Sequence, residues 1–406
     1  MAPLMNRPPS WLVALLAGST LSIGAASARQ ATHITPPVVA AISADPAAPQ
    51  DLAKESIIDV VFVLDTTGSM SGLIEGAKQK IWSIANTIAT AEPRPVIRMG
   101  LVAYRDRGDE YITKLTPLTD DLDAVYADLM KFVAAGGGDG PESVNQALHE
   151  GVMLQPWSDD PNALKLIYLV GDAPPHMGYE QDTKYAESCS TAAAKGIIIN
   201  TIQCGSWSET TPYWQDIARL AEGEYFAIQQ DGGVTVVATP FDAELASLGA
   251  SLAATACGWG DETAQMRAAE KTEAGRDIAA GAPAAAQAAR AAYFVSAAGK
   301  TSALGEQELV DDVKSGRVKL EDVPADQLPE AFKGLTLTQQ QEKIDQIAAE
   351  REKIQQRIAE LSRQRDEYLK QEMARLGTES KDSFDAKVTD CLREQAQRKG
   401  ISYDKK

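Results

Sequence analysis

Hydrophobic and polar positions change period repeatedly between residues 57 and 256. Residues 57–64 are a run dominated by β-branched and large apolar side chains, which is typical of a strand buried on both faces. Residues 71–91 instead repeat apolar side chains at helical spacing, which predicts an amphipathic helix. The same change recurs along this part of the chain, so the pattern predicts strands that alternate with helices.

Further strands are expected at 96–104, 111–115, 164–170, 197–203 and 225–228, and further helices at 122–133, 142–153, 179–195, 212–221 and 241–256. Strands that alternate with helices form a mainly parallel sheet covered on both faces, so we expect a doubly wound, Rossmann-like α/β fold. Ligands of such folds bind beyond the carboxyl ends of the strands. Polar motifs in loops directly after strands are therefore candidates for function.

The composition changes after residue 256. Residues 257–336 combine an Ala-rich stretch with short helices broken by prolines, and we interpret them as a linker region. Residues 337–375 carry an imperfect heptad pattern that predicts a long helix or coiled coil, and a helical tail follows at 376–406. The apolar seam would either join chains into a homo-oligomer or pack back on its own chain as a helical hairpin.

The first residues have the pattern of a secretory signal peptide. Arg7 precedes a mostly apolar segment, and Ala-Ser-Ala ends at Ala28, which is an expected cleavage site. Cleavage of residues 1–28 would give a secreted or periplasmic protein without a transmembrane segment, beginning with a disordered spacer at 29–54. An uncleaved N-terminal anchor is the alternative, but the apolar segment is short for a membrane span.

Charge and residue usage exclude several kinds of partner and site. The formal net charge is −18, so nucleic acid would be repelled. Only three histidines occur and no C-x-x-C motif is present, which argues against a histidine-rich or zinc-ribbon metal site. A metal held by oxygen atoms remains compatible with this composition.

The sequence Asp65-Thr66-Thr67-Gly68-Ser69-Met70-Ser71 directly follows the first predicted strand. A tight loop there would bring the Asp65 carboxylate and the hydroxyls of Thr67 and Ser69 together above the sheet. Hard oxygen ligands suit one divalent cation, Mg²⁺ in the first place and Ca²⁺ or Mn²⁺ as alternatives. The motif is a metal-site candidate, and a helix-capping role for Asp65 is the simpler alternative.

The chain resembles the von Willebrand factor A family, whose metal-ion-dependent adhesion site carries D-x-S-x-S after the first strand. Here Thr67 replaces the middle serine and keeps the hydroxyl. The resemblance covers about residues 55–256. Two later loops match it: Asp139 in Gly-Gly-Gly-Asp-Gly-Pro-Glu stands where the family places a metal-binding threonine, and Asp172 matches the second aspartate.

The resemblance implies a metal set of Asp65, Thr67, Ser69, Asp139 and Asp172, and a protein partner that completes the coordination with an acidic residue. The extra carboxylate of Asp139 would favour a bound cation and would leave it less positive charge to attract that residue. Beside the metal we place three candidates for a ligand rim, with structural roles as the alternatives: Glu142, His176 and Trp207.

Four functions compete. Metal-dependent protein recognition or adhesion is the reading we favour, and a structural envelope protein assembled by its coiled-coil tail is the main alternative. An enzyme is not expected, because the loop has no second aspartate at position 67 for phosphoryl transfer, no phosphate-binding P-loop exists and Ser69 has no evident histidine base. A chaperone-like subunit is disfavoured by the export signal.

The four cysteines are widely scattered in the sequence. Cys189 lies late in a predicted helix, and Cys204 ends the strand that follows. A short connection usually lays a helix against its next strand, so we expect a Cys189–Cys204 disulfide in an oxidising compartment. Two buried free thiols are the alternative.

Overall fold

The computed structural model describes residues 56–138, 140–376 and 383–403. The predicted signal peptide at 1–28 and spacer at 29–54 lie outside the described residues. The described residues belong to one compact unit. Within this described part of the chain, none of the helices is long and apolar enough to cross a membrane.

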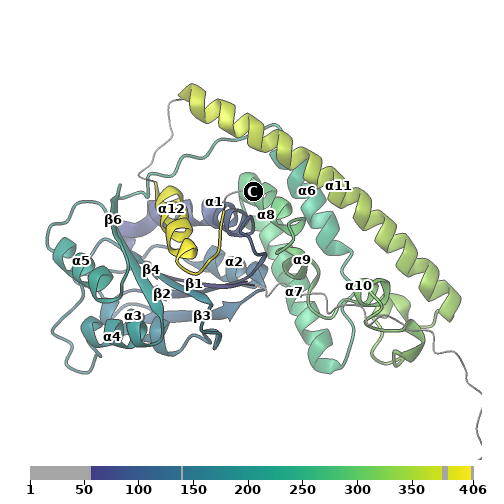
Figure 1. Ribbon diagram of the computed structural model, residues 1–406, viewed down its shortest axis with the longest axis horizontal. Coiled ribbons are helices and arrows are strands. Elements are labelled where there is room, and N and C mark those ends of the chain that lie inside the picture. Colours follow the sequence, from purple (N-terminus) through teal and green to yellow (C-terminus); the bar gives the residue numbers. More distant parts are fainter. Residues whose placement is uncertain (1–55, 139, 377–382, 404–406) are drawn as a thin grey trace, which may run out of the picture. The chain divides into compact units, whose positions relative to one another are not determined.

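A six-stranded sheet forms the centre of the molecule, in the order β3-β2-β1-β4-β5-β6 (Figure 1). All neighbouring strands are parallel except β3, which runs antiparallel to β2. The strands are β1 Ser56–Asp65, β2 Pro95–Tyr104, β3 Thr113–Thr119, β4 Leu164–Gly171, β5 Ile197–Cys204 and β6 Tyr225–Ile228. The predicted doubly wound α/β fold with a mainly parallel sheet is thus confirmed.

The helices alternate with these strands and then continue beyond them. Those of the α/β part are α1 Ser71–Ile88, α2 Leu122–Lys131, α3 Val144–Met153, α4 Tyr185–Ala194, α5 Thr210–Leu220 and α6 Asp242–Ala254. Those that follow are α7 Glu262–Gly281, α8 Ala284–Phe294, α9 Lys300–Leu304, α10 Leu309–Lys314, α11 Leu337–Leu376 and α12 Phe384–Gln397. Short 3₁₀ turns occur at η1 Gly68–Met70, η2 Leu320–Asp322 and η3 Glu330–Phe332.

Alternate side chains of β1 enter two separate cores. Val61 and Val63 join the core beneath α3, α4 and α5, whereas Phe62 and Leu64 join the core beneath α1, α2 and α12. This two-sided burial explains the nearly continuous apolar run of the strand, because successive side chains of a strand point to opposite faces.

Helix α12 comes from the end of the chain and covers the α/β sheet. Phe384 packs against Phe62, with ring centroids 6.0 Å apart, and the Tyr168 hydroxyl donates to the Val388 carbonyl at 3.1 Å. Figure 1 shows α12 beside α1 over the sheet. The region predicted as a separate C-terminal tail therefore supplies part of the core of the α/β sheet.

The long helix expected at 337–375 is observed as α11, but its apolar seam packs within the chain. Ile358 and Leu361 are buried in the core that also includes residues of α6 and α8, and Ile344 is buried with Leu309 and Phe332. The seam is thus covered by contacts within the chain, as in the arrangement in which the helix packs back on its own chain. The heptad pattern records burial but not which partner provides it, and here residues of the same chain provide it. Association of two chains through α11 stays a prediction.

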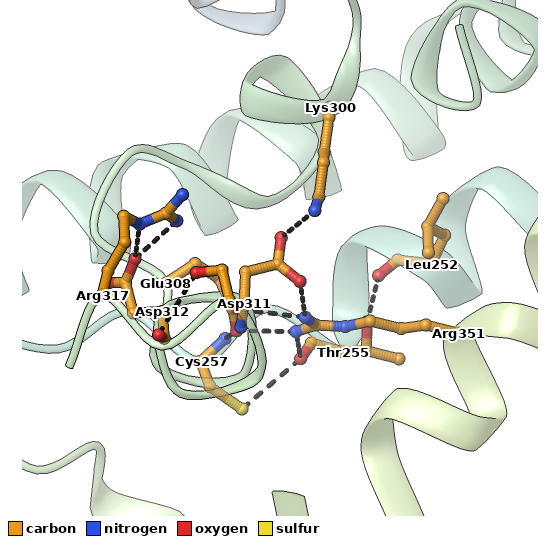
Figure 2. A network of polar contacts seen from close by, with 10 residues as sticks. Leu252, Thr255, Cys257, Lys300, Glu308, Asp311, Asp312, Arg317 and Arg351 are labelled. Carbon is orange, nitrogen blue, oxygen red and sulfur yellow. Dashed lines mark hydrogen bonds and ion pairs between the residues drawn. The ribbon is translucent and has the colours of Figure 1, made fainter. Parts of the chain in front are cut away.

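One position of this helix holds a buried arginine that forms an ion pair. Arg351 is buried and donates to Glu308 and to the Thr255 carbonyl, which follows α6 (Figure 2). Asp311 of α10 accepts from the same guanidinium. Arg351 therefore joins α11 to the end of α6 and to α10.

Candidate metal site

The loop after β1 gathers three of the predicted ligands. Asp65 is the last residue of β1, and its Oδ1 accepts hydrogen bonds from the Thr67 amide at 2.8 Å and the Thr67 hydroxyl at 2.6 Å. The hydroxyl oxygens of Thr67 and Ser69 are 3.3 Å apart. Asp65 Oδ2 is buried and accepts no hydrogen bond from the described residues. This free oxygen is available to a cation.

The second aspartate lies beside the first. Asp172 follows β4, the strand next to β1 in the sheet. Complete burial and, to a smaller extent, the nearby Asp172 carboxylate together raise the pKa of Asp65 to about 7. Two carboxylates held this close favour a bound cation, because the cation removes their mutual repulsion.

Gln230 is a site residue that the sequence reasoning missed. It lies in the loop between β6 and α6, and its Nε2 donates to Asp172 Oδ2 at 2.7 Å and to the Ser69 carbonyl at 3.3 Å. Gln230 thus joins the two loops that carry the predicted ligands. No motif marks it, because an isolated glutamine after a strand is common.

Glu142 lies deeper in the site than a rim position implies. Its side chain is buried, and its Oε2 accepts no hydrogen bond from the described residues. Burial raises the pKa of Glu142 to about 9, with Asp65, Asp106, Asp109 and Asp172 adding to the rise. The structure thus places a third carboxylate in the electrostatic environment of the two aspartates.

The glycine loop before Glu142 approaches the ligands closely. Gly137 has a φ of +77°, and a Cβ on it would stand 3.0 Å from Thr67 Cβ and 3.1 Å from Glu142 Oε1. The loop therefore needs glycine both for its backbone conformation and for space. Asp139, predicted as a ligand from this loop, lies outside the described residues.

Tyr104, the last residue of β2, is a second site residue that the sequence reasoning missed. Its hydroxyl is buried without a partner among the described residues. A Cβ on Gly171 would stand 2.5 Å from this hydroxyl and 3.1 Å from Asp65 Oδ2. Burial raises the pKa of Tyr104, and Asp65 and Glu142 add to the effect. The neutral phenol therefore lies close to the Asp65 carboxylate.

His176 supports the loop after β4. Its backbone amide donates to the Glu142 carbonyl at 2.9 Å, and its ring stacks on Tyr179 with centroids 3.7 Å apart. The Tyr179 hydroxyl donates to Asp106 Oδ2 at 2.7 Å. These contacts hold residues 176–184 as a loop, so α4 begins at Tyr185 and not at Tyr179 as predicted.

Trp207 is partly exposed in the loop after β5. Its side chain is 39 % exposed, and its ring atom Cη2 lies 2.7 Å from where a Cβ on Gly140 would stand. The loop after β5 therefore meets the glycine loop at this tryptophan. The ring remains accessible to a partner.

The predicted Cys189–Cys204 disulfide was wrong. The four cysteines, all in the described part of the chain, are free thiols. Cys189 on α4 joins the core on one face of the sheet, whereas Cys204 of β5 points into the core on the other face. The sheet separates the two sulfur atoms, because the side chain at the strand end faces away from the helix that precedes the strand.

The donor set fits a hard cation only if hydroxyls take part. Among residues 56–138, 140–376 and 383–403, no three His, Cys, Asp or Glu side chains lie together as a metal-binding group. Asp65 and Asp172 would therefore need the hydroxyls of Thr67 and Ser69 as further ligands. Oxygen-only sets of this kind suit Mg²⁺, Mn²⁺ or Ca²⁺, and the unpartnered Asp65 Oδ2 supports the fit.

The α/β part of the chain matches a known protein family. The family model described as the von Willebrand factor A domain matches residues 59–236. An ariadne-like RING finger protein of Acanthamoeba polyphaga mimivirus is 21% identical over 212 residues, which are 48% of this chain and 21% of that protein. The chain thus spans about a fifth of the length of this relative.

Solved structures with similar folds are distant. A von Willebrand factor type A protein from Catenulispora acidiphila is 16% identical, with a TM-score of 0.33, and the match covers 44% of this chain and 40% of that one. Mussel byssus proximal thread matrix protein 1, with a zinc-occupied MIDAS motif, is 15% identical with a TM-score of 0.35, covering 44% and 43%. An aerotolerance-related membrane protein from Bacteroides fragilis is 15% identical with a TM-score of 0.31, covering 43% and 92%.

The family match spans the sheet from β1 to β6 and includes each loop that carries a described ligand candidate. Residues 59–236 of this chain therefore form a von Willebrand factor A domain.

Proposed function

We propose that the chain recognises a protein partner through a divalent cation held by the von Willebrand factor A domain, and that it binds this partner without catalysing a reaction. The von Willebrand factor A fold is typical of protein-recognition domains. The observation that carries the proposal is the buried, unpartnered Oδ2 of Asp65, next to the Thr67 hydroxyl and the Asp172 carboxylate.

Four described residues would hold the cation: Asp65, Thr67, Ser69 and Asp172. Asp139 is a proposed fifth. The bound cation would supply a positive centre that accepts an oxygen atom of the partner. Gln230 would hold the Asp172 carboxylate and the Ser69 backbone in fixed positions relative to each other, since it donates to both.

Isothermal titration of the full chain with Mg²⁺, Mn²⁺ and Ca²⁺ tests the metal part of this proposal. We expect one binding site in the unaltered chain and none in Asp65→Asn. A matched control is Asp159→Asn, an exposed aspartate that belongs to no part of the site. Absence of heat with all three metals in the unaltered chain would contradict the proposal.

Export is a further part of the proposal and rests on residues 1–28 alone. We propose that the precursor loses this segment and acts outside the cytoplasm. N-terminal sequencing of the mature protein from its producing cells should begin at Arg29. Mature protein that retains Met1 would instead identify the segment as an anchor.

A further inference from the structure

Three large apolar side chains are exposed around the candidate metal site. Val133 is 66 %, Met177 39 % and Trp207 39 % exposed. Each lies in a loop at the same edge of the sheet, after α2, β4 and β5 respectively. Exposed apolar side chains gathered at one place mark an interaction surface, and tryptophan and methionine are enriched at such surfaces.

Hydrogen bonds tie these loops to the site. The Val133 carbonyl accepts from Arg105 Nη2 at 2.7 Å, and Arg105 Nε donates to the Thr66 carbonyl at 3.2 Å. Met177 follows His176, whose amide donates to Glu142. A partner that covers these apolar side chains would therefore also cover the metal position.

Acidic side chains without an ion-pair partner among the described residues stand in loops at the same edge of the sheet. Glu180 follows β4, Glu209 follows β5 and Asp231 follows β6, and all three are exposed. We name these three, with Val133, Met177 and Trp207, the rim.

The basic residues of this edge are fewer than the acids of the rim. Lys184 is in the loop that carries Glu180 and donates to the Tyr179 carbonyl, so it offsets one of the three acids at most. Arg105 pairs with Glu110 at 3.4 Å and Arg107 pairs with Asp182. Both guanidinium groups are thus engaged with carboxylates outside the rim. The rim keeps a negative charge even beside a divalent cation, because Asp65 and Asp172 by themselves balance the two charges of the cation.

We propose that the rim binds a basic segment of a partner protein, with a lysine or arginine side chain over the Trp207 ring and against Glu180, Glu209 and Asp231. A cation placed over an exposed indole is stabilised by the ring, and a negative surface attracts and orients a positive partner. An uncharged oxygen of that segment would reach the metal, since an acidic residue would be repelled by the rim.

This inference rests on the proposed recognition function and specifies the chemistry of the partner. It differs from the acidic ligand that the family resemblance implied. The basic partner is inferred from the charge of the loops around the metal position, and not from the residues that would hold the metal.

Fluorescence anisotropy with two labelled probes, a short oligolysine and a short oligoglutamate peptide, tests the inference on the full chain at physiological salt with Mg²⁺. We expect oligolysine to bind and oligoglutamate not to bind. The triple variant Glu180→Gln, Glu209→Gln, Asp231→Asn should weaken oligolysine binding about tenfold, and Trp207→Ala a few-fold.

The matched control removes three exposed acids far from the site, by Glu273→Gln, Glu306→Gln and Glu321→Gln. It changes the net charge equally and should leave oligolysine binding within about twofold, because screened charges beyond a Debye length contribute little. An equal loss in both triple variants would overturn the inference by showing that oligolysine follows net charge.

The two proposals fail in different ways. Preferential binding of oligoglutamate, abolished by chelator, would overturn the basic partner and leave the metal site supported. Loss of oligolysine binding in the rim variant but not in the control variant supports the basic partner. This holds even if direct titration detects no Mg²⁺ binding, a result that would overturn the metal site alone.

Discussion

Arg351 forms a bidentate ion pair with Glu308: Nη1 lies 2.9 Å from Oε2 and Nη2 lies 2.6 Å from Oε1. The two side chains are 4 % and 1 % exposed. Glu308 also accepts hydrogen bonds from the amides of Cys257 and Asp311 (Figure 2). One carboxylate thus fixes α11, the start of α10 and the chain that leaves α6.

Arg351→Met should destabilise the protein by about 3–5 kcal/mol, because it leaves the Glu308 charge buried without its partner. The free energy of unfolding by urea measures the effect. Arg357→Met on the same helix is the matched control, since Arg357 is 43 % exposed where it pairs with Glu244, and it should have a much smaller effect. Equal losses for the two variants would show that the buried pair has no special role.

Millimolar Mg²⁺ should raise the melting temperature of the unaltered chain, because a ligand of the native state stabilises it by about 2.7 kcal/mol at a hundred times its dissociation constant. Asp65→Asn should abolish this shift while preserving the size of the side chain. Differential scanning calorimetry with and without chelator measures both. A metal-induced shift that persists in Asp65→Asn would place the cation elsewhere.

Without added metal, stability should fall as the pH rises. Folding raises the pKa of Asp65 from 3.8 to about 7 and that of Glu142 from 4.5 to about 9, mainly by burial. The folded state therefore binds more protons than the unfolded state between about pH 4 and 9, so stability is greatest below this window and is lost through it.

Urea unfolding at several pH values across this window, in the presence of chelator, measures the slope of stability against pH. Glu142→Gln should make this slope shallower. Saturating Mg²⁺ should also flatten the curve, since the cation stabilises the ionised carboxylates. A metal-free stability that is independent of pH would contradict the placement of these two carboxylates.

All four cysteines should react with iodoacetamide in urea without reductant. In the native protein they should react slowly, because they are buried and burial raises the pKa of Cys189 to about 12. Mass spectrometry counts the added groups in each state. Recovery of any disulfide-linked peptide from the unreduced protein would contradict the four free thiols.

Phe384→Ala should destabilise the protein by about 3–5 kcal/mol, as expected for an aromatic side chain removed from a packed core. Phe384 is 2 % exposed and lies against Phe62 of β1. Leu376→Ala, at a position 46 % exposed at the end of α11, should cost about 0.5 kcal/mol or less. Denaturant unfolding followed by circular dichroism compares the variants.

Local patterns in the chain determined the α/β fold and part of the site. The run at 57–64 can only be buried on both faces, and Asp65, Thr67 and Ser69 are close in sequence, so one tight loop brings them together. The alternation of strands and helices then placed Asp172 at the same edge of the sheet, since parallel strands end together.

Contacts between distant segments were decided only by the tertiary structure. The burial of Glu142, the hydrogen bonds of Gln230 and the packing of Phe384 on Phe62 each join residues far apart in sequence. Periodicity reports that a side chain is buried but not against what. The heptad of α11 therefore left open whether a second chain or the same chain covers the seam, and in the structure α6 and α8 contact it. The faces of Cys189 and Cys204 were decided in the same way, by the sheet that passes between them.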